Sequence, residues 1–139
     1  MIELIAAAAL AAQDAQPRAE LGELRAFLLS NRTGQLSEDL SPPESGGHWN
    51  RLFEGEDIII TAELRTDGEQ FLRQPLRIVA RVGRRILGHR VHNGILTSPE
   101  GRAYQPLILL NAACAGDIQV TATFGTQTRT ETLQMRCGE

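Results

Sequence analysis

The chain has 139 residues, of which 42% are hydrophobic and 22% are charged. This length suits a single domain, and this composition excludes an intrinsically disordered chain. Its 14 basic residues are all arginine, and its 17 acidic residues give a formal net charge of -3. That balance excludes the strongly basic character typical of a nucleic-acid-binding domain. The use of arginine alone reflects either the codon usage of a GC-rich genome or a need for the forked donors of guanidinium groups.

The first twelve residues form an apolar, alanine-rich run. The run is shorter than the roughly 20 residues needed to span a bilayer, and we interpret residues 1–12 as a signal peptide. Glu3 stands where a signal peptide usually carries a basic residue, so an N-terminal helix that stays on the protein is the alternative. We expect a flexible mature N-terminus over residues 13–23 and one domain over residues 24–139. The mature protein is then periplasmic or secreted, without a stable membrane anchor.

The C-terminal two thirds of the chain read as short strands separated by turns, which predicts an all-β fold. Residues 57–66 alternate between apolar and polar side chains, so one face of this strand should lie in the core. Residues 76–82 repeat the alternation and place Arg77 and Arg81 on the solvent side. Residues 85–92 predict a further strand whose core face is ambiguous, because both faces carry apolar side chains.

Turns and apolar runs define the remaining expected elements. Asn93-Gly94 predicts a β-hairpin turn. Residues 106–111 form a continuous apolar run, which we interpret as a strand covered on both faces. Residues 24–30 could begin a helix or a strand, and we favour a strand, with residues 35–40 as a possible eighth. About seven to eight antiparallel strands at this length predict an immunoglobulin-like β-sandwich.

The last two expected strands, residues 117–124 and 128–137, flank Gly125-Thr126, where a leading glycine is the signature of a type II′ hairpin turn. A two-residue loop here would bring Cys114 directly opposite Cys137. Their Cα atoms would then lie about 4.5 to 5.5 Å apart, which a disulfide can bridge. We predict that these two cysteines, the only ones in the chain, form a disulfide. Two free thiols in a reducing compartment are the alternative.

The sequence shows no recognised catalytic or metal-binding pattern. His89 and His92 lie three residues apart on an expected strand, so they should point to opposite faces and cannot easily chelate one ion; His48 lies in a distant loop. The carboxylates of residues 54–57 and 67–69 lack a calcium-site spacing, and solvated acidic loops are the simpler interpretation. No nucleophile-turn motif occurs. We therefore expect a non-enzymatic protein without a cofactor or metal.

The strongest charge feature is a series of arginines in residues 70–99, a stretch that contains no acidic residue. Four of them are candidate residues for binding an anion or a partner: Arg77, Arg81, Arg84 and Arg85. Guanidinium groups suit an acidic segment of another envelope protein or an anionic glycan. The alternative is a solvated face whose charges are balanced by Glu63 and other acids on adjoining strands. Nucleic acid is not an expected partner, because interleaved aromatic residues for base stacking are missing.

Four segments of the sequence are characteristic when taken together: Trp49-Asn50, the alternating strand 58–64, the apolar residues 107–110 before Cys114, and the C-terminal residues 135–139. Together they resemble uncharacterised exported proteins of Gram-negative bacteria with immunoglobulin-like folds. The resemblance implies a fold and a compartment and transfers no catalytic residue. We interpret Trp49 as a plug at one end of the core. The function expected is a non-enzymatic binding or structural module, with a small secreted inhibitor or accessory subunit of an enzyme as the alternative.

Overall fold

The computed structural model describes residues 18–42 and 56–135. Within these two ranges the chain forms antiparallel strands and no helix, which confirms the expected all-β class. It follows that the described residues contain no helix able to cross a membrane. The strands are β1 (Ala19–Leu29), β2 (Asp57–Thr66), β3 (Phe71–Leu72), β4 (Leu76–Val82), β5 (Arg85–His92), β6 (Ile95–Leu96), β7 (Arg102–Leu109), β8 (Gly116–Phe124) and β9 (Gln127–Met135).

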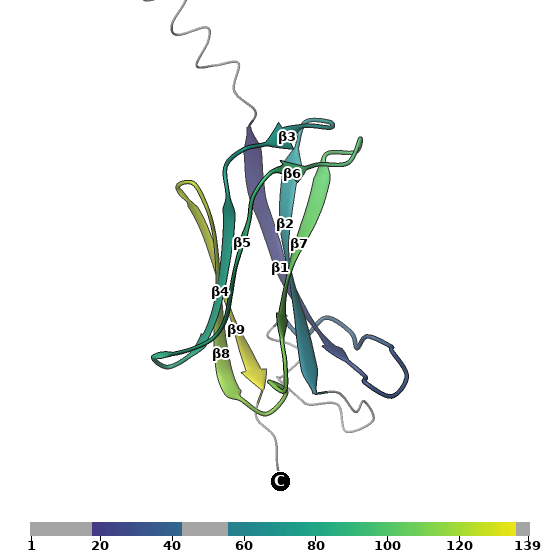
Figure 1. The fold of residues 1–139 in the computed structure, drawn as a ribbon, viewed down its shortest axis with the longest axis vertical. Coiled ribbons are helices and arrows are strands. Elements are labelled where there is room, and N and C mark those ends of the chain that lie inside the picture. The colour runs from purple at the N-terminus through teal and green to yellow at the C-terminus, as the bar shows by residue number, and fades with distance from the viewer. Residues whose placement is uncertain (1–17, 43–55, 136–139) are drawn as a thin grey trace, which may run out of the picture.

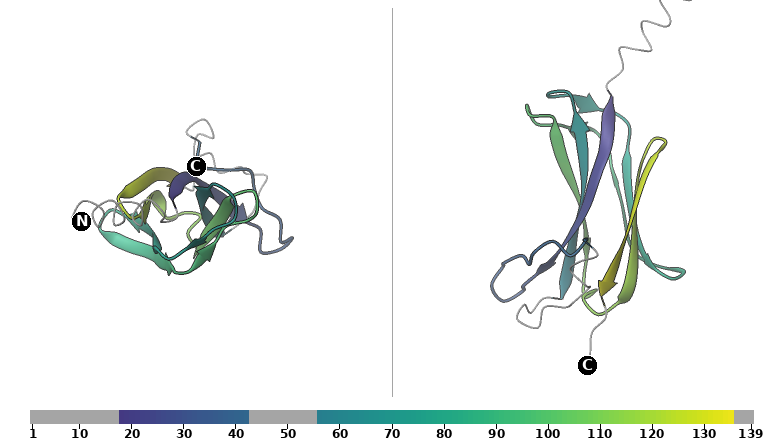
Figure 2. Two further views of the ribbon diagram at one scale, coloured as in Figure 1. Left: turned by 90° about the horizontal axis from the view of Figure 1, so that it is seen from above. Right: turned by 180° about the vertical axis from the view of Figure 1, so that it is seen from behind.

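Two antiparallel sheets face each other across a common core (Figure 1). One sheet has three strands in the order β1-β2-β7, and the other has four strands in the order β5-β4-β8-β9. The short strands β3 and β6 pair with each other at one end of the molecule. The view from behind in Figure 2 shows the two sheets facing each other. Their inward side chains form the core between them. The arrangement is compatible with the expected β-sandwich.

Alternate residues of the central strands fill the core, as the period of two in a β-strand requires. The inward side chains are almost completely buried, and the faces predicted from the sequence for β2 and β4 are confirmed. Side chains with an exposed fraction of 4% or less on β2, β4 and β8 are Ile58, Ile60, Ala62, Leu64, Leu76, Ile78, Ala80, Ile118, Val120, Ala122 and Phe124.

The β8–β9 hairpin has the register that the sequence predicts. Phe124 pairs with Gln127, and the register continues without a shift to the pair formed by Gly116 and Met135. Gly125 begins the two-residue loop with a φ of 61°. A type II′ turn requires this left-handed backbone at its first central residue, where glycine carries no Cβ that would clash.

Several predictions fall partly or wholly on residues that the structure does not describe. Cys114 lies in the turn that precedes β8, whereas Cys137 lies outside the described residues. His48, Trp49 and the segment 1–12 also lie outside them. The disulfide, the tryptophan plug and the signal peptide therefore stay predictions.

The prediction of a hairpin at Asn93-Gly94 is wrong. The strand before this turn, β5, pairs with β4, whereas the strand after it, β6, pairs with β3. Gly94 does adopt a left-handed φ of 63°, so the chain turns where expected. The turn carries the chain out of the four-stranded sheet. Turn residues fix a change of direction, but they do not fix the strand with which the next strand pairs.

The strand expected at residues 106–111 begins earlier and is covered on one face only. β7 starts at Arg102 and is an edge strand that pairs with β2 alone. Ile108 is 50% exposed, and Leu110, just beyond the strand, is 72% exposed. Pro106 suits this edge position because it has no N–H group to donate to a neighbouring strand.

Residues 35–40, expected to form a strand, instead lie along the outer edge of β1. They make one isolated bridge there, between Leu29 and Leu36. The Leu40 N–H donates to the carbonyl oxygen of Ala26 at 2.8 Å. An uncovered edge would expose unpaired backbone groups to other chains, and this segment covers part of it.

Side chains close the two open sides between the sheets. The amide of Gln127 on β9 accepts a hydrogen bond from the Leu21 N–H at 2.8 Å and donates to the Ala19 oxygen at 2.9 Å, as a neighbouring strand would. On the other side, His92 Nε2 of β5 donates to the Pro106 oxygen of β7 at 2.8 Å. The start of β1, expected to be flexible, pairs with the end of β2 and so is part of the three-stranded sheet.

Candidate functional site

The outward side chains of the four-stranded sheet form a continuous surface, which we call the arginine face. They follow one another across β5, β4, β8 and β9 because paired residues of neighbouring strands point to the same side. The rows are Val91, Arg77, Thr123 and Thr128; His89, Val79, Thr121 and Thr130; and Ile86, Arg81, Gln119 and Thr132. The residues that flank β4 on this face were not predicted from the sequence. The β4–β5 hairpin could have revealed those of β5, whereas β8 is distant from β4 in the chain.

The structure brings two of the four candidate arginines together on this face. Arg77 and Arg81 are both exposed and lie four residues apart on β4, which separates their Cα atoms by about 13 Å at the usual rise of a strand. Arg84 lies exposed in the β4–β5 turn at the end of the face. Arg85 is also exposed, but it pairs with Val82, whose side chain points inward from β4. Arg85 therefore does not lie on the arginine face.

In the part of the chain that the structure describes, no carboxylate lies within ion-pair distance of these four arginines. The alternative in which Glu63 balances their charge is wrong. Glu63 points outward from β2, on the opposite sheet, and forms ion pairs with Arg65 and Arg102 there. The reason is topological: β2 and β4 follow each other in the chain but belong to different sheets.

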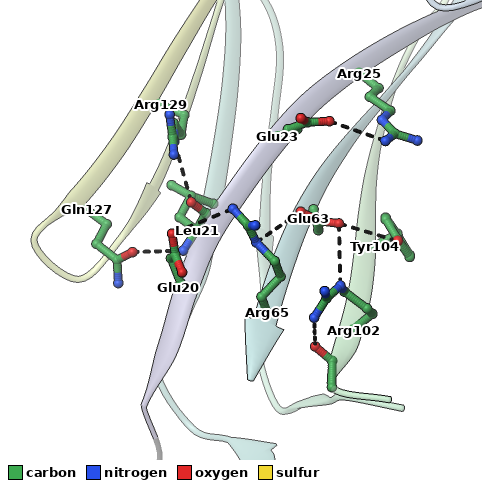
Figure 3. Close-up of polar contacts among 11 residues, drawn as sticks. Glu20, Leu21, Glu23, Arg25, Glu63, Arg65, Arg102, Tyr104, Gln127 and Arg129 are labelled. Atoms are coloured by element: carbon green, nitrogen blue, oxygen red, sulfur yellow. Dashed lines mark hydrogen bonds and ion pairs between the residues drawn. The ribbon is translucent and has the colours of Figure 1, made fainter. Parts of the chain in front are cut away.

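The three-stranded sheet carries a network of ion pairs on its outer face (Figure 3). Glu63 is its centre, with a side chain that is only 13% exposed. Its carboxylate lies 3.3 Å from Arg65 Nε and 3.8 Å from Arg102 Nε, and it accepts a hydrogen bond from the Tyr104 hydroxyl at 3.4 Å. Arg65 also reaches Glu20 at 3.6 Å.

A further pair on the same face joins Arg25 to Glu23 on β1. The Arg25 guanidinium donates to the Glu23 carboxylate at 3.2 Å, and this hydrogen bond raises the pKa of Arg25 above its ordinary value. Six charged side chains of this outer face lie in ion pairs with one another: Glu20, Glu23 and Glu63 with Arg25, Arg65 and Arg102. Among the described residues, the two outer faces differ in electrostatic character, because the guanidinium groups of the arginine face have no acidic partner whereas Arg25, Arg65 and Arg102 do.

One carboxylate lies near the arginine face without neutralising it. Asp117 is two residues before Gln119 on β8 and so lies one row beyond Arg81. It already has an interaction partner of its own, and it forms no ion pair with Arg81. The face therefore keeps an excess of positive charge along β4.

The two described histidines point to opposite sides of β5, as their spacing predicts. His89 is exposed on the arginine face beside Val79, whereas His92 is buried and hydrogen-bonds to Pro106. Among residues 18–42 and 56–135, no group of three or more metal-ligating side chains is close enough to hold an ion.

A narrow crevice lies between β1 and β9, and it has no room for a water molecule. Apolar side chains form most of its lining, with Arg25, Ser41 and Glu131 at its polar positions. Ligand pockets usually enclose roughly 300 to 1,000 Å³. The crevice is smaller than that, so the arginine face is the stronger candidate for a functional surface.

No protein-family model matches the sequence, and a search of curated proteins finds no significant match to it.

Proposed function

We propose that the protein is a non-enzymatic binding module that docks on an anionic partner through its arginine face. The observation that carries this proposal is the contrast between the two outer faces. Arg77 and Arg81 project from a central strand without a carboxylate partner in the described residues, while the other sheet pairs its charges internally. Guanidinium groups in this state have all their donors available for carboxylate, sulfate or phosphate oxygens.

The shape of the surface supports binding rather than catalysis. The arginine face is built on four paired strands, so its side chains project side by side from the surface of a sheet. Acid, base and nucleophile chemistry needs groups that converge on one reacting atom. Arg77 and Arg81, about 13 Å apart at their Cα atoms, instead suit an extended anionic partner that spans both.

We further propose that the protein works in the periplasm or after secretion, as an immunoglobulin-like sandwich with a disulfide between Cys114 and Cys137. The apolar residues 1–12 support export. The β8–β9 register supports the disulfide, since two steps beyond its last pair, Gly116 with Met135, it leads to the two cysteines. A partner in this setting would be another envelope protein or an anionic glycan.

Reversing the charge of Arg77 and Arg81 tests the docking surface. In the double variant Arg77→Glu with Arg81→Glu, binding to immobilised heparin or polyglutamate should weaken at least tenfold in low salt. Two favourable contacts are replaced by two repulsive ones, and charge-assisted hydrogen bonds each contribute about 1.5 to 3 kcal/mol before solvent screening. Surface plasmon resonance at two salt concentrations measures the effect.

The matched control is the double variant Arg25→Glu with Arg32→Glu, which changes the net charge equally. Arg25 lies on the opposite sheet and Arg32 in the turn after β1, and both are exposed. This control should retain most of the binding. An equal loss in the two variants would show that net charge alone attracts the probes, and the docking proposal would then fail.

A further inference from the structure

We infer that the partner presents to the arginine face an extended, acidic protein segment in which a carboxylate, an apolar residue and a second carboxylate occupy every second position. The inference rests on the proposed function and names the chemistry of the partner. Three side chains of β4 carry it: Arg77, Val79 and Arg81, which point to the same side at every second position of the strand.

The spacing of these three residues matches an extended chain most closely. Side chains on one face of a strand repeat about every 6.6 Å, whereas side chains four residues apart on one face of an α-helix repeat about every 6 Å, so a helix falls about 1 Å out of step over the span of the two arginines. A partner segment that is itself extended and runs along β4 therefore keeps the same repeat. Its two carboxylates then lie over Arg77 and Arg81, and its apolar residue lies over Val79.

Apolar side chains beside the arginines favour a protein segment over a polyanion. Ile86, in the row of Arg81, is 58% exposed, and Val91 is partly exposed in the row of Arg77. Val79 itself lies partly exposed between the two arginines. A polysulfate or polyphosphate has no apolar group to cover these side chains, whereas a peptide has.

The placement of the aromatic residues argues in the same direction. Recognition of sugars commonly uses aromatic rings as stacking surfaces, and the arginine face has none among the described residues. Phe27 and Tyr104 lie on the outer face of the other sheet, Phe71 on β3, and Phe124 in the core. The side of β4 opposite to β5 instead offers hydroxyl and amide groups, from Thr123, Thr121 and Gln119, for hydrogen bonds to a peptide.

The test compares three peptides of equal length and charge and one polysaccharide, each labelled with a fluorophore and titrated with the full-length mature protein. The first peptide repeats Glu-Thr-Val-Thr-Glu, the second has serine in place of valine, and the third keeps the composition of the first but scrambles the order. Heparin is the polysaccharide. Fluorescence anisotropy gives each dissociation constant.

We expect the valine peptide to bind at least fivefold more tightly than the serine and scrambled peptides. The variant Val79→Thr, which keeps a β-branched side chain of similar volume, should remove this preference, and Ile86→Thr should reduce it. The variant Arg77→Glu with Arg81→Glu should weaken all three peptides. Circular dichroism confirms that each variant is folded before titration.

Two results would overturn the inference while leaving the docking proposal intact. One is equal binding of all three peptides with no effect of Val79→Thr; the other is tighter binding of heparin than of the valine peptide, which would make a glycan the partner. In both cases the arginine reversal would still weaken binding. If none of the four probes binds the wild-type protein, the inference and the proposed function both fail.

Discussion

Replacing Gly101 by alanine should lower the free energy of unfolding by about 2 to 5 kcal/mol. Gly101 has a φ of 79°, a left-handed backbone that costs other residues roughly 1 to 2 kcal/mol. A Cβ atom there would also lie 2.1 Å from the backbone oxygen of Thr66, so the two segments must separate. Such overpacking costs typically about 1 to 3 kcal/mol more. Urea denaturation measures the change.

The effect of Gly101→Ala spreads because this glycine anchors a hydrogen-bonded cluster at one end of the sandwich. The Thr66 N–H donates to the Gly101 oxygen at 2.9 Å, and the hydroxyl groups of Thr66 and Thr97 lie 2.8 Å apart. Thr97 is 1% exposed, and its hydroxyl accepts from the Gln70 N–H at 2.8 Å. A shift at Gly101 therefore disturbs buried polar groups, which are costly when left unpaired.

Gly34→Ala is the matched control for this prediction. Gly34 has a similar φ of 73°, but a Cβ atom there would have no neighbour within 4 Å. Only the backbone cost remains, so the loss should be about 1 to 2 kcal/mol. If the two variants lost equal stability, the close approach of Gly101 to Thr66 would not be the cause.

The second large effect concerns the proposed disulfide. The serine double variant, Cys114→Ser with Cys137→Ser, should lower the free energy of unfolding by about 3 kcal/mol, because it removes the restriction that a loop of 24 residues places on the unfolded chain. Reducing the wild-type protein with dithiothreitol should have the same effect. Guanidinium denaturation with and without the reductant measures both changes.

The serine variant should show no further response to dithiothreitol, which separates the disulfide from general effects of the reductant. Mass spectrometry after alkylation counts the free thiols directly. Two alkylated cysteines in the protein purified without reductant would contradict the disulfide and weaken the proposed extracellular location.

Local sequence patterns were enough to predict the strands that alternate clearly or that turn residues bound. β2, β4 and β5 begin and end at the expected residues, because polar and apolar side chains alternate along them or turn residues bound them. The β8–β9 register followed from Gly125 alone, since a two-residue loop leaves one pairing. The ambiguous faces of β5 have a structural cause: the pairing with β4 shifts by one residue between Ala80 and Arg81.

Features that depend on contacts distant in sequence could not be predicted in this way. A continuous apolar run such as residues 106–111 does not reveal whether one face of the strand or both faces are covered in the fold. The start of β1 gains its order from pairing with β2, and Gln127, more than one hundred residues away in the chain, adds hydrogen bonds to Leu21 and Ala19. Residues 35–40 are held by hydrogen bonds to the edge of β1, and they do not form a strand of their own.

The candidate site was predictable only in part for the same reason. The positions of Arg77 and Arg81 on one face follow from alternation along β4, and the structure confirms them. Whether their charge is balanced depends on the sheet to which Glu63 belongs. Sheet membership is set by pairing between distant strands, and β2 pairs with β1 and β7 rather than with β4.

The most direct test of the account is a map of the surface that an anion contacts. Isotope-labelled mature protein titrated with oligoglutamate should show the largest backbone amide shifts in β4, β5 and β8, around Arg77 and Arg81. The outer face of β1, β2 and β7, where Glu63 pairs with Arg65 and Arg102, should shift little. Shifts concentrated on that second face, or spread evenly over both, would contradict the claim that the arginine face is the docking surface.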